Sequence, residues 1–156
     1  MEKSYLTEIK AAVTAVMGAL TAWLGVLAWP VYILVLLNII DYATGLTAAP
    51  YRGEERSSDK GFRGIAKKIC MWLLVALGAI LDWLLYYAAG TVGLALPFNF
   101  LVGCLVAIWL ICNEIVSILE NISDIGVELP PFLMTLVQWV KQAAEEKGTI
   151  KKDKGA

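Results

Sequence analysis

The sequence predicts an all-α integral membrane protein, with four apolar helices and a C-terminal amphipathic helix in a single domain over residues 1–156. Hydrophobic residues make up 59% of the chain and charged residues only 17%, whereas a soluble domain usually carries about 25% charge. Charges are absent from four long stretches: 11–40, 42–51, 69–81 and 83–113. Since about 20 apolar residues cross the hydrocarbon core of a bilayer, these stretches suffice for several crossings.

The four apolar helices are predicted at about 7–28, 31–49, 65–88 and 98–119. The last three are predicted to span the membrane. The first either spans it as well or lies on it as an amphipathic or re-entrant segment. Pro30 suits a tight turn between the first two helices, because proline removes a backbone hydrogen bond from a helix interior.

A fifth helix, amphipathic, is predicted at 131–147, because Pro130 and Pro131 suit a helix start. Its apolar residues share one face: Phe132, Leu133, Leu136, Val137 and Val140. We expect it at the cytoplasmic interface or packed on a partner. The basic tail, 148–156, either touches anionic lipid or is a plain solvated end.

The positions of lysine and arginine predict the orientation in the membrane. The polar loop at 50–64 and the start of the following helix carry six basic residues: Arg52, Arg56, Lys60, Arg63, Lys67 and Lys68. Basic loops remain in the cytoplasm, so this loop and the C-terminus are predicted inside, with Lys60, Arg63, Lys67 and Lys68 as a basic anchor. The N-terminus is predicted inside if the first helix spans and outside if it does not.

The first helix carries a narrow face of small and hydroxyl residues: Thr7, Ala11, Thr14, Gly18, Thr21 and Gly25. Small residues let helix backbones approach closely in lipid, where the hydrophobic effect does not drive helices together. This face therefore either packs against another helix or lines a water-filled space.

Polar residues also occur inside the other apolar helices. Asn38, Asp41 and Gly45 share one face of the second helix, and Asp41 lies near mid-membrane with no basic residue of a span to pair with it. A charged carboxylate there is costly, so Asp41 is expected to be a functional or oligomer-contact acid, or a protonated carboxyl bonded between helices. Asp82, in the outer third of the third helix, is a further intramembrane polar residue.

The fourth helix ends in a polar stripe: Asn113, Glu114, Ser117, Glu120, Asn121 and Asp124. The stripe extends into the span, so it is expected to face other helices or other copies of the chain. The alternative is an ion pair of Glu114 or Glu120 with Lys67 or Lys68, which lie on the same side of the membrane.

Catalytic and metal-binding patterns are absent from the sequence. The chain has no histidine, no pair of cysteines spaced C-x-x-C, no G-x-S-x-G and no glycine-rich phosphate loop. We therefore expect no enzyme activity, no cofactor and no metal. The net charge of −1 gives no global field that would attract nucleic acid.

Four ordered motifs resemble those of one family. They are Asp41-Tyr-Ala-Thr-Gly45, the run Ser58 to Lys68, the run Asn113 to Asn121, and Gly126-Val-Glu-Leu-Pro130. In this order and spacing, over about residues 30–137, the chain resembles the phage lysis and toxin-secretion holins of Gram-positive bacteria and their phages. The matching residues are Asp41, Thr44, Gly45, Gly61, Gly64, Lys67, Lys68, Asn113, Glu114, Ser117, Glu120 and Asn121.

The resemblance implies a multi-pass protein of the bacterial host's cytoplasmic membrane that forms homo-oligomers and is not an enzyme. Such proteins open lesions through which an endolysin, or a large toxin, passes without direct contact being required. Two alternatives stay open at this point: a small ion-coupled transporter or channel subunit that uses Asp41 and Glu114, and a membrane scaffold that recruits a partner through helix 131–147.

Overall fold

The structure of the protein is a computed structural model that describes residues 2–53, 58–97 and 100–148, without the side chains of residues 2–4, 58–60 and 148. Five helices make up this part of the chain: α1 (Glu2–Leu24), α2 (Ala28–Ala48), α3 (Ser58–Thr91), α4 (Leu101–Asp124) and α5 (Pro131–Gly148). A 3-10 turn, η1 (Gly25–Leu27), joins α1 to α2. The predicted all-α class is confirmed.

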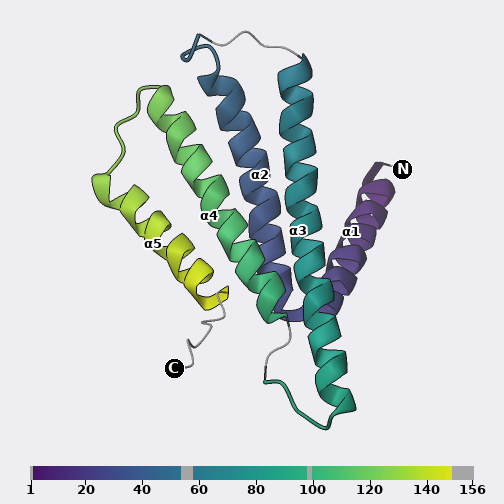
Figure 1. Ribbon diagram of the computed structural model, residues 1–156. Helices are drawn as coiled ribbons and strands as arrows, with labels where there is room; N and C mark the ends of the chain where they lie inside the picture. Colours follow the sequence, from purple (N-terminus) through teal and green to yellow (C-terminus); the bar gives the residue numbers. More distant parts are fainter. Residues whose placement is uncertain (1, 54–57, 98–99, 149–156) are drawn as a thin grey trace, which may run out of the picture.

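Within the described residues, three helical stretches are long and apolar enough to cross a membrane: Tyr5–Ala48, Gly61–Thr91 and Leu101–Asp124. The first of them is bent at η1, so it contains both α1 and α2, which run in opposite directions (Figure 1). The 34 residues of α3 give a helix roughly 51 Å long, well beyond the roughly 30 Å hydrocarbon core.

The turn between α1 and α2 lies earlier than the sequence predicted. The helix breaks at Gly25, which has a φ of +52°, a conformation that glycine adopts without a steric penalty. Pro30 lies inside the first turn of α2. Its missing N–H costs nothing there, because the first N–H groups of a helix have no partner within the helix.

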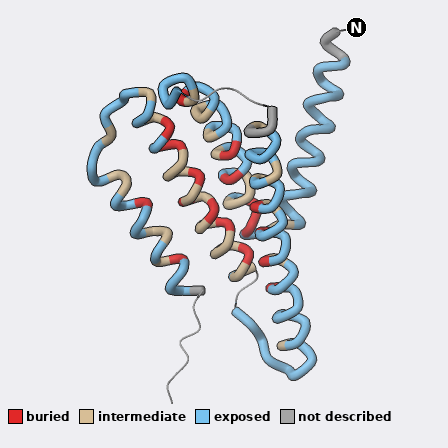
Figure 2. The backbone as a smooth tube through the Cα atoms, turned by 45° about the horizontal axis from the view of Figure 1, so that its top comes forward, coloured by how far each residue is buried: buried red, intermediate tan, exposed pale blue. Residues whose placement is uncertain are grey.

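The centre of the bundle is α4, which packs against α2, α3 and α5 (Figure 1). Buried residues therefore concentrate along α4 and on the sides of the helices that meet it (Figure 2). The main core consists of Leu27, Leu34, Met71, Val75, Ala107 and Leu110. In contrast, the described side chains of α1 are exposed up to Trp23.

The helix α5 folds back along α4 of the same chain, where the sequence predicted a helix at the membrane interface or on a partner. Val137 packs with Cys112 and Leu119 of α4. The reason is that α5 carries more apolar surface than one narrow stripe: Val137 and Ala144 are buried, while Phe132, Leu136 and Trp139 form a second, exposed apolar side.

The crossing of α3 and α4 depends on two glycines. A Cβ atom added to Gly78 would lie 3.0 Å from the Cα of Gly103, and one added to Gly103 would lie 3.3 Å from the backbone N of Ala79. This is the close backbone approach that small residues allow between helices in a membrane. The start of α4 is thereby held against α3.

Candidate functional site

A polar groove of about 590 Å³ runs beside α4, between α3 and α5. It is lined by a mixture of acids, bases, an amide and a hydroxyl. Its polar residues are Asp41, Lys67, Lys68, Asn113, Glu114, Ser117, Glu120 and Lys141. Because α3 and α4 are apolar enough to span a membrane, the groove places charged groups beside membrane-spanning helices.

Lys68 of α3 is the centre of the groove's hydrogen bonds. Its Nζ donates to Asp41 Oδ2 at 2.9 Å, to Asn38 Oδ1 at 2.9 Å and to Glu114 Oε2 at 2.5 Å. The side chain of Glu114 is only 6% exposed and that of Lys68 is 21% exposed. One ammonium group thus joins α2, α3 and α4 through two largely buried ion pairs.

This arrangement corrects the expectation that no basic residue of a span pairs with Asp41. The backbone of Lys68 lies in the first third of α3, close to the basic loop. Its four-carbon stem carries the ammonium group inward to Asp41 and Glu114. The pairing of Glu114 with Lys68 is the alternative that the sequence offered for the polar stripe.

A second centre, Asn121 of α4, extends the network. Its Nδ2 donates to Thr44 Oγ1 at 3.1 Å and to Asp41 Oδ1 at 3.2 Å. Its Oδ1 accepts a hydrogen bond from Arg52 Nη1 at 3.0 Å, and the same nitrogen pairs with Asp124 at 2.9 Å. The network therefore runs continuously from Glu114 to Asp124.

Two features show that some polar groups in the inner part of the network are not fully paired. Asp41 and Glu114 share a single lysine, so carboxylates outnumber ammonium groups at this point. Asn38 is buried, and its Nδ2 has no hydrogen-bond partner in the described part of the chain. Buried polar groups are normally satisfied by protein or ordered water, and the Asn38 Nδ2 is an exception within this network.

The predicted polar stripe divides into two parts. Glu114 and Asn121 are buried in the network, and Glu114 also lines the groove together with Asn113, Ser117 and Glu120. Of the predicted basic anchor, Lys67 lines the groove, Lys68 is the centre of the network, and Arg63 is exposed. The side chain of Lys60 lies outside the described residues. Gly45 faces the Asn121 amide, and a Cβ there would lie 3.6 Å from its Nδ2, at ordinary van der Waals contact.

Asp82 does not belong to this groove. Its two carboxylate oxygens accept hydrogen bonds from the backbone N–H groups of Val102, at 2.9 Å, and Gly103, at 2.7 Å. These N–H groups belong to the first turn of α4, where a carboxylate is favoured by both the unpaired donors and the helix dipole. Asp82 of α3 therefore caps α4.

The small face of α1 has few contacts within the chain. Thr21 Oγ1 forms a hydrogen bond with Tyr32 Oη of α2 at 2.8 Å, and Gly25 forms the turn. Ala11, Thr14 and Gly18 are exposed. The residues on this face are thus largely available for contacts outside the chain.

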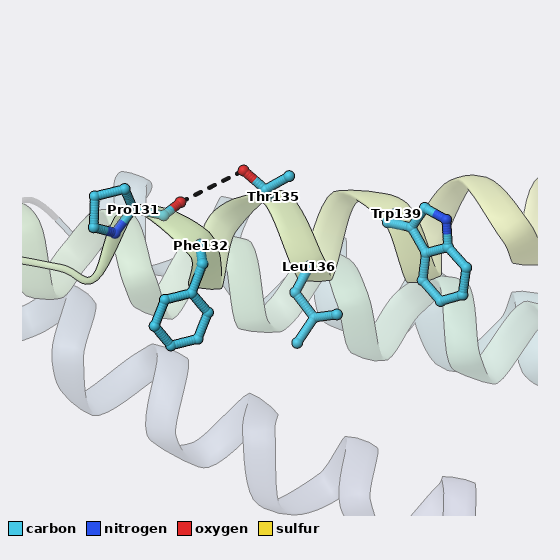
Figure 3. Close-up of a pocket in the computed structure, with 5 residues that line it drawn as sticks. All are labelled: Pro131, Phe132, Thr135, Leu136 and Trp139. Carbon is cyan, nitrogen blue, oxygen red and sulfur yellow. Dashed lines mark hydrogen bonds between the residues drawn. The ribbon is translucent and has the colours of Figure 1, made fainter.

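Sequence reasoning missed the contribution of α5 to the groove. Lys141 lines it, with its Nζ 5.0 Å from the centroid of the Trp109 ring, and Trp109 Nε1 donates to Glu145 Oε1 at 2.6 Å. Both contacts depend on α5 folding back along α4, which no local pattern reports. On its other side, α5 presents Phe132, Leu136 and Trp139 (Figure 3).

Comparison with known proteins points to one family. A family model described as "Bacteriophage holin family" matches residues 18–142. An uncharacterised protein of Listeria monocytogenes is 38% identical over 107 residues, which cover 69% of this chain and 68% of the relative. An uncharacterised protein of Clostridium perfringens is 32% identical over 118 residues, 75% of this chain and 79% of the relative.

A more distant relative has a functional name. The protein called "Probable holin" of Bacillus phage phi105 is 26% identical over 124 residues, which cover 80% of this chain and 82% of that protein. No solved structure matches the chain.

Proposed function

The chain belongs to the bacteriophage holin family, and from this membership we propose that it acts as a holin. Copies of the chain assemble in the cytoplasmic membrane of a bacterium and open lesions. These lesions release an endolysin for lysis of the host cell, or export a large toxin. The observation that carries the proposal is the family match over residues 18–142, which includes all of α2, α3 and α4.

The polar groove supports this proposal physically. A bundle that only anchors a protein in lipid has no need for charged side chains beside its spanning helices, since each is costly there. Lys67, Glu120 and Lys141 all line the groove. When several copies meet with their grooves facing each other, these side chains can face water in place of hydrocarbon.

The orientation we propose follows the basic residues. Arg52 and Arg63 lie near the end of the bundle where α2 ends and α3 begins, and we assign this end to the cytoplasm by the positive-inside rule. The opposite end carries exposed aromatic side chains, Trp83, Tyr86 and Tyr87, of the kind that lie at membrane interfaces. The N-terminus then lies on the cytoplasmic side if α1 crosses. The end of α5 lies toward the start of α4 (Figure 1), which is the opposite end of the bundle, so this orientation departs from the cytoplasmic C-terminus that the sequence predicts.

The test is inducible expression in bacteria that also make a cytoplasmic endolysin with no export signal. We expect an abrupt loss of membrane potential, read with a voltage-sensitive dye, followed by lysis. Cells with the endolysin alone are the control and should stay intact. Continued growth with an intact potential, despite high levels of membrane-inserted protein, would refute the proposal.

The ion-coupled transporter predicts a different result. Purified protein in liposomes would then carry a selective, saturable flux that Asp41→Asn abolishes, and large dyes would stay inside. The holin proposal expects large dyes to leave the liposomes. Release of a dye too large for a selective channel therefore separates the two functions.

The exposed small face of α1 provides a further prediction. A Cβ atom at Gly18 has no heavy atom within 4 Å, so Gly18→Leu should leave the fold and membrane insertion intact. If this face joins copies of the chain, the bulkier side chain keeps their helices apart. We expect delayed or abolished lysis in the induction experiment.

The matched control is Val16→Leu, which also enlarges an exposed side chain but lies on the opposite face of α1. It should lyse with the timing of the original chain. If Gly18→Leu also lysed at the unchanged time, the small face of α1 would be excluded as a critical contact between copies.

A further inference from the structure

The contacts between α5 and α4 determine how deeply α5 lies in the membrane. Glu145 bonds to Trp109 and Lys141 lies over the Trp109 ring. Trp109 follows the start of α4 by eight residues, or roughly 12 Å in a helix about 36 Å long. When α4 spans the membrane, the second half of α5 therefore lies within the depth of the hydrocarbon core.

The sequence of α5 does not suit hydrocarbon. It is not among the stretches that are apolar enough to span, and its second half contains Lys141, Glu145, Glu146 and Lys147. Charged side chains at this depth are tolerated when they face protein or a water-filled cavity. Lys141 lines the groove and Glu145 bonds to Trp109 beside it, so the water of the groove is the environment that fits this side of α5. Glu146 and Lys147 lie in the last turn of α5, where long charged side chains can reach the membrane interface.

The helix α5 has three sides of different polarity, as expected of a helix that separates water from lipid. Val137 and Ala144 are buried, and Val137 packs with residues of α4. Figure 3 shows Phe132, Leu136 and Trp139 together on an exposed apolar side. The remaining side, which we name the polar edge, consists of Gln138, Lys141, Gln142 and Glu145.

The polar edge is continuous with the groove, because Lys141 lines the groove together with Lys67 and Glu120 of the neighbouring helices. We propose that α5 forms part of the wall of the water-filled opening, with its polar edge toward the water and Phe132, Leu136 and Trp139 toward lipid. This inference rests on the proposed holin function. It assigns the opening to the α4–α5 side of the bundle, and the small face of α1 to contacts between copies.

The first test is ion selectivity in planar bilayers containing the full-length chain. Gln142 is exposed on the polar edge, so Gln142→Glu should shift the reversal potential in a KCl gradient toward cation selectivity, and Gln142→Lys toward anion selectivity. The control is Glu128→Lys, which changes charge in the turn before α5. We expect the two Gln142 variants to move in opposite directions and the control to stay near the original value.

The second test is the reactivity of single cysteines with a charged, membrane-impermeant thiol reagent. The background has Cys70, Cys104 and Cys112 replaced by alanine. Gln142→Cys should react at least about tenfold faster than Leu136→Cys, because a thiol in hydrocarbon stays protonated and unreactive. Reaction at position 142 should also reduce the conductance.

The outcomes separate this inference from the function on which it rests. Conductance that opens normally, with unchanged selectivity in both Gln142 variants and equal reactivity at positions 136 and 142, would overturn the role of α5 and leave the holin function standing. Absence of any conductance from the original chain in bilayers, together with no loss of potential in cells, would overturn both.

Discussion

Replacement of Lys68 by methionine is expected to destabilise the bundle by about 3–5 kcal/mol, the effect typical of removing one partner from a buried ion pair. Lys68 is the ion-pair partner of both Asp41 and Glu114. Methionine keeps most of the stem but removes the ammonium group. Two largely buried carboxylates are then left near each other without a positive partner, and Asn38 Oδ1 loses its donor.

The measurement is unfolding of the purified protein in detergent, followed by circular dichroism against temperature or denaturant. Lys67→Met is the matched control, because the neighbouring Lys67 is exposed, and exposed substitutions usually change stability by less than about 0.5 kcal/mol. The triple variant Lys68→Met, Asp41→Asn and Glu114→Gln should recover much of the loss, since it removes the uncompensated charges as well.

Equal stability of Lys68→Met and Lys67→Met would show that the Lys68 ion pairs do not hold the helices together. A triple variant no more stable than Lys68→Met would locate the loss in packing instead of charge. The three chains therefore separate the electrostatic role of Lys68 from its volume.

The sequence was most informative where a property depends on length and composition. The absence of charge over 83–113 predicts membrane-spanning helices without further knowledge, and this stretch holds the end of α3 and the first half of α4. The pairing of Glu114 with Lys68 could also be predicted from the sequence, because both residues lie near the same predicted end of the bundle. Asp41 was placed at mid-membrane by counting residues, and the reach of Lys68 was underestimated.

Other features depend on tertiary contacts that local patterns do not contain. Pro30 is a strong breaker signal, yet the turn formed at Gly25, because a proline in the first helical turn breaks no hydrogen bond. Asp82 resembles any acid in a span, and its role as a cap requires the start of α4 beside it. The apolar residues of α5 predict that one side is buried but not which helix covers it.

Replacement of Gly103 by leucine is expected to have the second large effect, a loss of roughly 3 kcal/mol or more. A Cβ at this position would lie 3.3 Å from the backbone N of Ala79 and 3.4 Å from both Asp82 Oδ2 and Leu27 Cδ2. Overpacking a filled contact costs about 1–3 kcal/mol. Because one neighbour is backbone, α3 must move away from α4 as a whole.

That movement has a second consequence, since it carries Asp82 away from the N–H groups of Val102 and Gly103. Loss of a helix cap costs about 0.5–2 kcal/mol, which adds to the overpacking term. The single variant Asp82→Ala measures the cap alone, so the unfolding free energy of Gly103→Leu should fall below that of Asp82→Ala. The control is Gly90→Leu, because a Cβ at Gly90 has no heavy atom within 4 Å.

The glycine crossing and the Lys68 network hold the same helix pair at two different depths, α3 against α4. If both contacts are needed to keep the groove in its described shape, Gly103→Leu should lower the stability and also change the timing of lysis on induction. Gly90→Leu should change neither. A Gly103→Leu chain that unfolded at the original temperature would show that the backbones of α3 and α4 do not meet at Gly78 and Gly103 closely enough to exclude a side chain, and the cap at Asp82 would then lose its geometric basis.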